Sequence, residues 1–323
     1  RISGKAMLAY IVRRLIWTPI VLLVVTFVTF ALGFYGPGDP IQVLMGQKND
    51  PAVVERIRRE RGLDKPFLEQ YVTYVFGDGS EERRGVIRGD FGESYKFTGQ
   101  RVSDLIFSRI AVSAQLGALS LAIGVTIGVI FGLTASVNQG RWVDPFTIST
   151  GLLLSSLPVF ILQPLLAYAL SRQLHLLPSS GWEGLLHPKV IMPTLVMCLG
   201  PIGGIARLMR ASTLEVINQD YVRTGRAKGL SETTVRLNYI TRNSILPIFT
   251  VVGLSLASLV EGAFITETLF GIPGVGRLAV DAFFARDYPI IMAMTLLVAG
   301  AYVLANLIVD IGYTFLDPRI RLQ

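Results

Sequence analysis

The chain has 323 residues, of which 51% are hydrophobic and 16% charged, and its formal net charge is +7. About a quarter of the residues of an ordinary soluble domain are charged, so this composition excludes such a domain unless its buried core is very large. The apolar residues are gathered into six uncharged runs, which lie between Arg14 and Asp39, Arg109 and Arg141, Asp144 and Arg172, Lys189 and Arg207, Arg242 and Glu261, and Asp287 and Asp310.

The six runs are long enough to cross a membrane. They enclose 24, 31, 27, 17, 18 and 22 residues, and a helix needs about 20 apolar residues to cross a hydrocarbon core of about 30 Å. Helices of soluble proteins keep a polar stripe, which these runs lack. We therefore predict an all-α integral membrane protein with six transmembrane helices. The first run is expected to be a retained anchor because it is too long for a signal peptide, and Met7 is the expected native start.

The basic residues predict the orientation of the chain. Short cytoplasmic loops carry an excess of Lys and Arg. Fourteen lie in segments 1–14, 138–145, 207–246 and 316–323, against four in 172–189 and 271–289. Both termini are therefore expected in the cytoplasm, which places residues 36–110 outside.

The outer segment 36–110 has 12 basic and 12 acidic side chains. A charge at the bilayer centre costs about 2.5–3.5 kcal/mol, so this segment is predicted to be a small folded subdomain facing water. One helix is expected to begin at Pro51, with Asp50 as its N-cap, and to stop at Gly62. A second is expected from about Pro66 until the glycines of 77–80 break it.

Several kinds of site are disfavoured by the residues present. Cys198 is the one cysteine, which rules out an intrachain disulfide and a cysteine metal cluster. His175 and His187 are interpreted as solvated loop residues in preference to metal ligands. No phosphate-binding loop of the G-x-x-x-x-G-K-[ST] type occurs, so the chain is not expected to be an ATPase or to bind a cofactor. The basic residues flank the runs and form no stripe for nucleic acid.

Ionisable residues are scarce in or next to the runs. Glu261, Glu267 and Asp310 lie close enough to run ends to be solvated from an interface, so a structural or gate-lining role is favoured over a proton relay. Pro158 in the third run and Pro201 in the fourth mark helices that are broken or bendable and that line a pathway. Glycines at 124, 128 and 132 form a strip that is expected to pack closely against another helix of the chain.

The cytoplasmic segment 207–246 is predicted to be a helix, a tight turn and a helix. Arg207 to Lys228 is expected to be helical, Gly229 to stop the helix, Ser231 to cap the next one, and Glu232 to lie in its first turn. Such a segment presents a short helix to a soluble partner.

Residues 220–230, DYVRTGRAKGL, resemble the coupling-loop motif of permease subunits of binding-protein-dependent ABC importers, in the dipeptide, oligopeptide and nickel branch. Four further segments match that branch: GPGDP at 36–40, GDFGES at 89–94, ETLFGIPGVG at 267–276, and LDPRIR at 316–321 together with Asp310. The resemblance covers essentially the whole chain from residue 7 to residue 322. It departs from the family in two respects: Gly225 stands where an alanine is expected, and the segment from Gly77 to Arg84 is longer than the family norm.

The resemblance implies a permease subunit that pairs with a second, similar permease, two cytoplasmic ATPase subunits that bind ATP and Mg, and an extracytoplasmic solute-binding protein. It places the subunit in the inner (plasma) membrane of a prokaryote, in contact with lipid. The implied transport is of peptides or similar small solutes by alternating access. The residues implied to contact an ATPase are Asp220, Tyr221, Arg223, Thr224, Arg226, Ala227, Lys228, Gly229 and Leu230.

The expected organisation is a cytoplasmic N-terminus (1–14), a first transmembrane helix (15–35), the outer subdomain (36–110), a five-helix permease domain (111–315) that contains the coupling loop 207–246, and a cytoplasmic tail (316–323). The alternative is a proton-coupled carrier acting without ATPase subunits, with Glu261, Glu267 or Asp310 as its relay. The residues do not distinguish a dipeptide, an oligopeptide, glutathione, a nickel chelate or a sugar as the solute.

Overall fold

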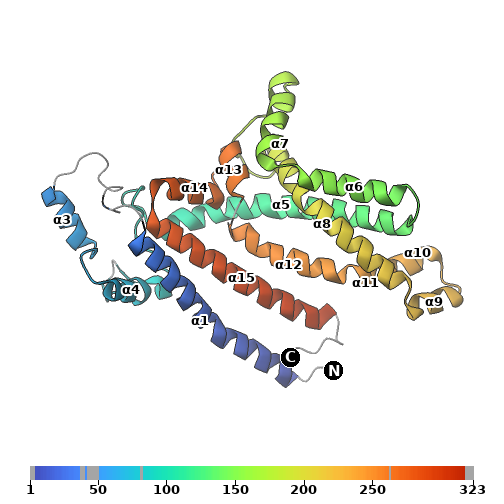
Figure 1. Ribbon diagram of the computed structural model, residues 1–323, viewed down its shortest axis with the longest axis horizontal. Coiled ribbons are helices and arrows are strands. Elements are labelled where there is room, and N and C mark those ends of the chain that lie inside the picture. The colour runs from blue at the N-terminus through green and yellow to red at the C-terminus, as the bar shows by residue number, and fades with distance from the viewer. Residues whose placement is uncertain (1–3, 37–40, 42–50, 81–82, 262, 317–323) are drawn as a thin grey trace.

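The computed structural model describes residues 4–36, 41, 51–80, 83–261 and 263–316 (Figure 1). The described residues are mainly helical, and a lone bridge between Glu93 and Arg101 is the β-type pairing recorded among them. The α-helices are α1 (Gly4–Tyr35), α3 (Pro51–Glu60), α4 (Phe67–Phe76), α5 (Val102–Val137), α6 (Val143–Ser156), α7 (Val159–Leu166), α8 (Ile191–Ile217), α9 (Asp220–Ala227), α10 (Glu232–Thr234), α11 (Arg242–Ser244), α12 (Leu246–Glu261), α13 (Phe264–Phe270), α14 (Val275–Ala285) and α15 (Tyr288–Leu316). The 3₁₀ segments are η1 (Val86–Arg88) and η3 (Pro188–Val190), and the π segments are η2 (Ala167–Gln173) and η4 (Val235–Thr241).

Four helices are long and apolar enough to cross a membrane: α1, α5, α8 with η3, and α15. They correspond to the first, second, fourth and sixth uncharged runs. Three bent helix pairs raise the number of candidate spans to as many as seven. In the third run, α6 and α7 meet at 90° where Pro158 follows the extended Leu157. The fifth run is α12, bent by 45° from the helix before it, while α13 and α14 form a further 90° pair.

The strip of glycines on α5 lies directly against α8, as the sequence predicts. A Cβ built on Gly124 would lie 2.5 Å from the carbonyl oxygen of Cys198, and one on Gly132 would lie 2.6 Å from that of Ala206. Glycine is therefore required for the two backbones to approach this closely. The strip belongs to the packing within one chain.

A leucine at Gly128 is expected to destabilise this helix pair. Even a Cβ at Gly128 would lie 2.9 Å from Cβ of Ile205 and 3.0 Å from the carbonyl oxygen of Ile202, and overpacking costs about 1–3 kcal/mol. Thermal unfolding of the purified chain should show a lower melting temperature for Gly128→Leu. Gly200→Leu is the matched control, because a Cβ there has no heavy atom within 4 Å. Equal melting temperatures for the two variants would contradict the close packing.

The remaining long helices form a second group beside α5 and α8. In Figure 1, α1, α15 and α12 run alongside one another, and α1 and α15 approach closely where a Cβ on Gly33 would lie 3.6 Å from Met292 Sδ. The core between the two groups includes Leu105 and Ile106 of α5, packed with Ile290 of α15. This core joins α5 of the first group to α15 of the second.

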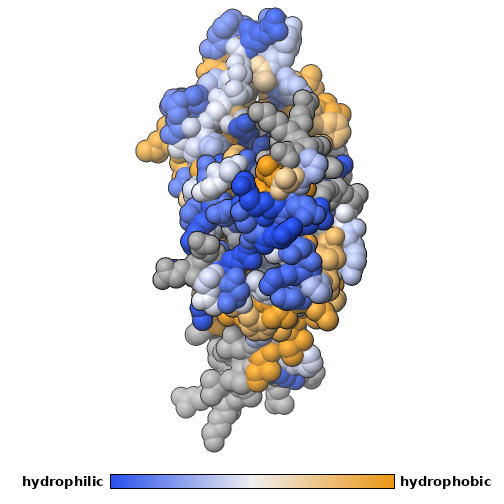
Figure 2. Space-filling view, turned by 90° about the vertical axis from the view of Figure 1, so that its left-hand side faces the viewer, coloured by the Kyte–Doolittle hydropathy of each residue, from blue (hydrophilic) through white to orange (hydrophobic). Residues whose placement is uncertain are grey.

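The outer segment contains the two predicted helices. Helix α3 begins at Pro51, and α4 runs from Phe67 until Gly77 ends it at φ 83°. The predicted N-cap Asp50 lies outside the described residues. The GDFGES segment contacts the turn between α14 and α15, because Ser94 Oγ donates to the buried carboxylate of Asp287 over 2.5 Å. Figure 2 shows that the surface at this end of the molecule is largely hydrophilic, with apolar surface bordering it.

Candidate functional site: the coupling loop and the helices that carry it

The prediction of one continuous helix from Arg207 to Lys228 is wrong, because the helix breaks at Asn218. Helix α8 ends at Ile217, and the side-chain amide of Asn218 donates to the carbonyl oxygen of Leu214 over 2.9 Å. The next residue, Gln219, has extended backbone angles and precedes α9. Asn competes with the backbone for such hydrogen bonds and so favours helix ends. The break separates the short helix α9 from the long helix α8, so the two can have different directions.

Helix α9 and the turn after it expose every residue that the sequence assigned to ATPase contact. From Asp220 to Leu230, the two buried residues are Val222 and Gly225, and both are absent from the predicted set. Val222 packs in a small core with Val235 and Ile240, with Val216, Ile217 and Tyr239 around it. One side of α9 thus holds the loop together and the other side is free for a partner.

The turn after α9 has the predicted local structure. Gly229 has φ +77°, a conformation in which a non-glycine residue is strained. Ser231 caps α10 by accepting a hydrogen bond from the backbone N–H of Thr234 over 3.3 Å, and Glu232 lies in the first turn. The predicted helix stop, cap and acidic first turn are confirmed.

An ion pair closes the same turn. The Arg226 guanidinium contacts both carboxylate oxygens of Glu232, with Nε–Oε2 and Nη2–Oε1 distances of 3.2 and 2.9 Å. Arg236 contacts the same carboxylate over 3.4 Å. Hydrogen bonds from Arg226, followed by the weaker effect of Arg236, hold the pKa of Glu232 below its usual range. The pair therefore stays ionised at neutral pH. Because both side chains are exposed, the pair adds little stability, and its contribution is the two-point contact that orients α9 relative to α10.

Alanine at Gly225 is expected to stabilise the loop. A Cβ there would make ordinary contacts of 3.8–3.9 Å with Leu230, Tyr239 and Val235. Since glycine in a helix costs roughly 1 kcal/mol relative to alanine, Gly225→Ala should raise the resistance of the loop to limited proteolysis. Gly229→Ala is the control and should lower that resistance, because its φ is positive. A loop that Gly225→Ala leaves unchanged or weakens would show that the glycine is required there.

Helix α8 is joined to α6 just before it reaches the coupling loop. The Arg210 guanidinium binds the Asp144 carboxylate in a bidentate manner, with Nε–Oδ1 and Nη2–Oδ2 distances of 2.6 Å. The Asp144 side chain is only 9% exposed. Farther along, a Cβ on Gly203 would lie 3.1 Å from the carbonyl carbon of Gly151, so the two helices also approach closely there. Displacement of α8 is therefore expected to carry α6 with it.

The two prolines assigned to a pathway have different surroundings. Pro158 lies at the break between α6 and α7, in agreement with the predicted broken helix. Pro201 lies inside α8, which continues as one helix through it. No described contact places either ring beside a solute site, so their role as pathway residues stays a prediction.

Glu267 is fully buried, so the expectation that an interface solvates it is wrong. Its carboxylate accepts hydrogen bonds from Ser113 Oγ (2.7 Å) and from the backbone N–H groups of Ala263 and Arg277 (3.0 Å each). Ser113 Oγ in turn accepts from the N–H of Val275 over 2.9 Å. One carboxylate thus joins α5 to the N-terminal ends of α13 and α14. These hydrogen bonds favour a structural role for Glu267, because each of them joins elements distant in sequence or caps a helix end.

Glu261 lies in a different environment at the end of α12. It is partly exposed and borders an apolar hollow of about 410 Å³ with Phe264, Phe283 and Phe284. Within the described part of the chain its carboxylate has no hydrogen bond or ion pair. Asp310 on α15 is partly buried and does have an interaction partner.

Sequence reasoning missed several of the residues that hold these sites together. Ser113, Asp144 and Arg210 act through contacts between helices distant in sequence, and no local pattern reveals them. Val222 was detectable, since it is an apolar residue between exposed polar ones on a short amphipathic helix.

Comparison with known proteins gives a consistent result over nearly the whole chain. Residues 124–322 match the family described as "Binding-protein-dependent transport system inner membrane component", and residues 7–117 match its N-terminal companion. A probable peptide ABC transporter permease protein of Sinorhizobium fredii is 39% identical over 97% of this chain and 99% of that protein. The dipeptide transport system permease protein DppB of Bacillus subtilis is 34% identical over 98% and 99%. The glutathione transport system permease protein GsiC of Escherichia coli K12 is 35% identical over the same shares.

Among solved structures, the MetNI methionine ABC transporter in an inward-facing conformation has a chain of similar fold. The TM-score is 0.53 at 16% sequence identity, over 66% of this chain and 96% of the other. At this identity the similarity concerns the fold alone.

Proposed function

This chain belongs to the family of binding-protein-dependent transport system inner membrane components, and we propose that it forms one half of the translocation pathway of an ATP-driven importer for peptides. The proposed complex contains a second, similar permease, two cytoplasmic ATPase subunits and an extracytoplasmic solute-binding protein. ATP and Mg would bind to the ATPase subunits. The peptide class is supported by relatives named for dipeptide, oligopeptide and glutathione transport.

The observation that carries the proposal is the surface of α9 and its turn. Nine residues from Asp220 to Leu230 are exposed at one end of the molecule, while Val222 and Gly225 hold α9 to the rest of the loop. A short helix whose outer side is exposed, and whose inner side is packed against the rest of the loop, is suited to transmit a displacement from a soluble subunit. We propose that Tyr221, Arg223 and Arg226 make the central contacts with an ATPase.

We further propose six spans with both termini in the cytoplasm, in which α6 and α7 form one bent span and α13 and α14 lie at the outer surface. The excess of Lys and Arg in segments 1–14 and 207–246 supports this orientation. In the proposed cycle, closure of the ATPase dimer moves α9 as a rigid body. The seam between α5 and α8 and the ion pair between Asp144 and Arg210 would transmit that motion to the outer side, with Pro158 and Glu261 beside the opening pathway.

Reconstitution of the complete complex tests the proposal. The chain should co-purify with an ATPase and a second permease, and proteoliposomes should take up peptide only when ATP and the loaded binding protein are supplied on the appropriate sides. Replacement of Tyr221 and Arg223 by alanine should reduce co-purification of the ATPase. Accumulation of solute by the isolated chain under a proton gradient, without ATPase subunits, would instead support the carrier alternative.

A further inference from the structure

Helix α4 of the outer segment has a side of apolar residues that no described part of the chain covers. Leu68, Val72 and Phe76 are 66%, 51% and 57% exposed. They are spaced four residues apart and therefore form one stripe along the helix. Exposed apolar residues scattered singly are ordinary, but a continuous stripe on one helix marks an interaction surface.

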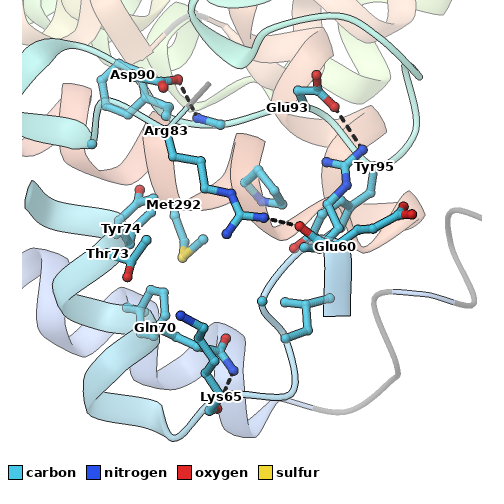
Figure 3. Close-up of a pocket in the computed structure, with 18 residues that line it drawn as sticks. Glu60, Lys65, Gln70, Thr73, Tyr74, Arg83, Asp90, Glu93, Tyr95 and Met292 are labelled. Atoms are coloured by element: carbon cyan, nitrogen blue, oxygen red, sulfur yellow. Dashed lines mark hydrogen bonds and ion pairs between the residues drawn. The ribbon is translucent and has the colours of Figure 1, made fainter. Parts of the chain in front are cut away.

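The other sides of α4 are already in use. Phe67, Tyr71 and Tyr74 pack against α1, and Val75 is buried. Gln70, Thr73 and Tyr74 line a cavity of about 300 Å³ between α4, the start of α15 and the loop that contains Arg83 (Figure 3). The stripe therefore lies on the side of α4 that has neither α1 nor this cavity beside it.

The contacts with α1 determine the depth of α4 relative to a membrane. The rings of Phe67, Tyr71 and Tyr74 all lie 5.4–5.6 Å from the ring of Phe30. Phe67 and Tyr71 also contact Phe27, and Phe67 contacts Phe34 and Tyr35, so α4 crosses α1 over a stretch centred near Phe30. Phe30 is five residues before Tyr35, the outer end of the apolar window Ile16–Tyr35. At 1.5 Å per residue, the crossing is about 7.5 Å inside that end. The Tyr71 hydroxyl reaches farther and donates to the carbonyl oxygen of Leu23 over 3.1 Å.

Helices that lie flat in a membrane surface bury their apolar face about 5–10 Å into the boundary between headgroups and acyl chains. The crossing at Phe30 places α4 at this depth. The α1 surface at this level is itself apolar and exposed, with Val28 and Leu32 at 49% and 68%, and Val24, one turn below Val28, at 58%. We therefore propose that α4 is an interfacial helix whose stripe of Leu68, Val72 and Phe76 inserts among the acyl chains of the outer leaflet.

This proposal refines the expectation that the whole of segment 36–110 faces water. Glu69 of α4 is exposed and bonded to Lys65 over 2.7 Å, so it can remain at the headgroups while the stripe enters the lipid. The inserted helix would hold the outer segment against the membrane surface. The inference depends on the chain spanning a membrane and is independent of the solute and of the ATPase.

Spin labelling tests the insertion, because a variant with Cys198 replaced by alanine has no other cysteine. Nitroxide labels at Val72→Cys and, as a matched control on the same helix, at Glu69→Cys would be introduced into this chain and measured in phospholipid vesicles, with and without the partner subunits. The label at 72 should collide more often with oxygen than with a water-soluble nickel chelate, and the label at 69 should show the reverse. A label at Leu68→Cys, which lies about 100° from Glu69 around the helix, repeats the test if Val72→Cys folds poorly.

Two results would overturn the proposal. Preferential collision of the label at 72 with the nickel chelate would show that the stripe faces water. Exclusion of both reagents from 72 would show that a protein, such as the second permease or the binding protein, covers it. Neither measurement requires transport, so failure of the proposed function would leave this test intact.

Discussion

Replacement of Gly229 by valine is expected to uncouple ATP hydrolysis from uptake in the reconstituted complex. Gly229 has φ +77° and ends α9 where the chain turns toward Ser231. A β-branched residue held in a sparsely populated conformation costs about 1–3 kcal/mol. The turn can avoid that cost by rearranging, which would displace α9 from the angle that the ion pair between Arg226 and Glu232 maintains. We expect ATP hydrolysis to continue while peptide uptake per ATP falls severalfold.

Gly140 provides a matched control for the strain itself. It lies in the turn between α5 and α6, has φ +76°, and like Gly229 has no heavy atom within 4 Å of a built Cβ. Gly140→Val therefore introduces similar strain outside the coupling loop. Uptake and ATP hydrolysis should fall together in this variant if they fall at all. An equal loss of coupling in both variants would refute a specific role for the turn at Gly229.

A graded series at Gly229 sharpens the experiment. Asn tolerates the left-handed conformation better than other non-glycine residues, and β-branched residues tolerate it least. Peptide uptake per ATP should therefore decrease in the order Gly, Asn, Ala, Val. An order that follows side-chain volume instead, with Asn as harmful as Val, would indicate a direct contact with the ATPase at this position.

The coupling loop shows which local features a sequence determines. The stop at Gly229, the cap at Ser231 and the starts of α3 and α4 depend on residues within one or two turns of each other, so local rules suffice. The break at Asn218 was missed because residues 207–228 as a whole favour a helix. There, one side-chain hydrogen bond to Leu214 and burial of Val222 outweigh the gain from continuing the helix.

The sequence predicts the position of an ionisable residue only from its distance to the end of an uncharged run. Glu261 and Glu267 are both near the outer end of the fifth run, and the same reasoning gave both an interfacial position. The structure separates them because Ser113 of α5 and the first residues of α13 and α14 surround Glu267, while Glu261 at the end of α12 stays partly exposed. Pairings of this kind join residues more than 150 positions apart, and a single sequence contains no signal for them.

Loss of the Glu267 carboxylate is expected to be the most destabilising single change considered. In Glu267→Ala the N–H groups of Ala263 and Arg277 and the Ser113 hydroxyl lose their buried acceptor. Each unsatisfied buried group costs about 1–3 kcal/mol, so we expect much less folded protein and a markedly lower melting temperature. Of the described hydrogen bonds that join the N-terminal ends of α13 and α14 to α5, only the one from the Val275 N–H to Ser113 Oγ would remain.

Two variants separate this structural role from a proton relay. Glu267→Gln keeps the size and one acceptor oxygen but places an amide donor near another donor, so it should be intermediate in stability. Glu261→Ala removes the same kind of side chain from a partly exposed position where the described chain gives its carboxylate no partner, and the melting temperature should change little. If Glu267→Gln melted like the native chain but abolished uptake, titration of this carboxyl group would be required after all. Similar melting temperatures for Glu267→Ala and Glu261→Ala would show that the hydrogen bonds at Glu267 contribute little, since the Glu261 carboxylate has none in the described chain.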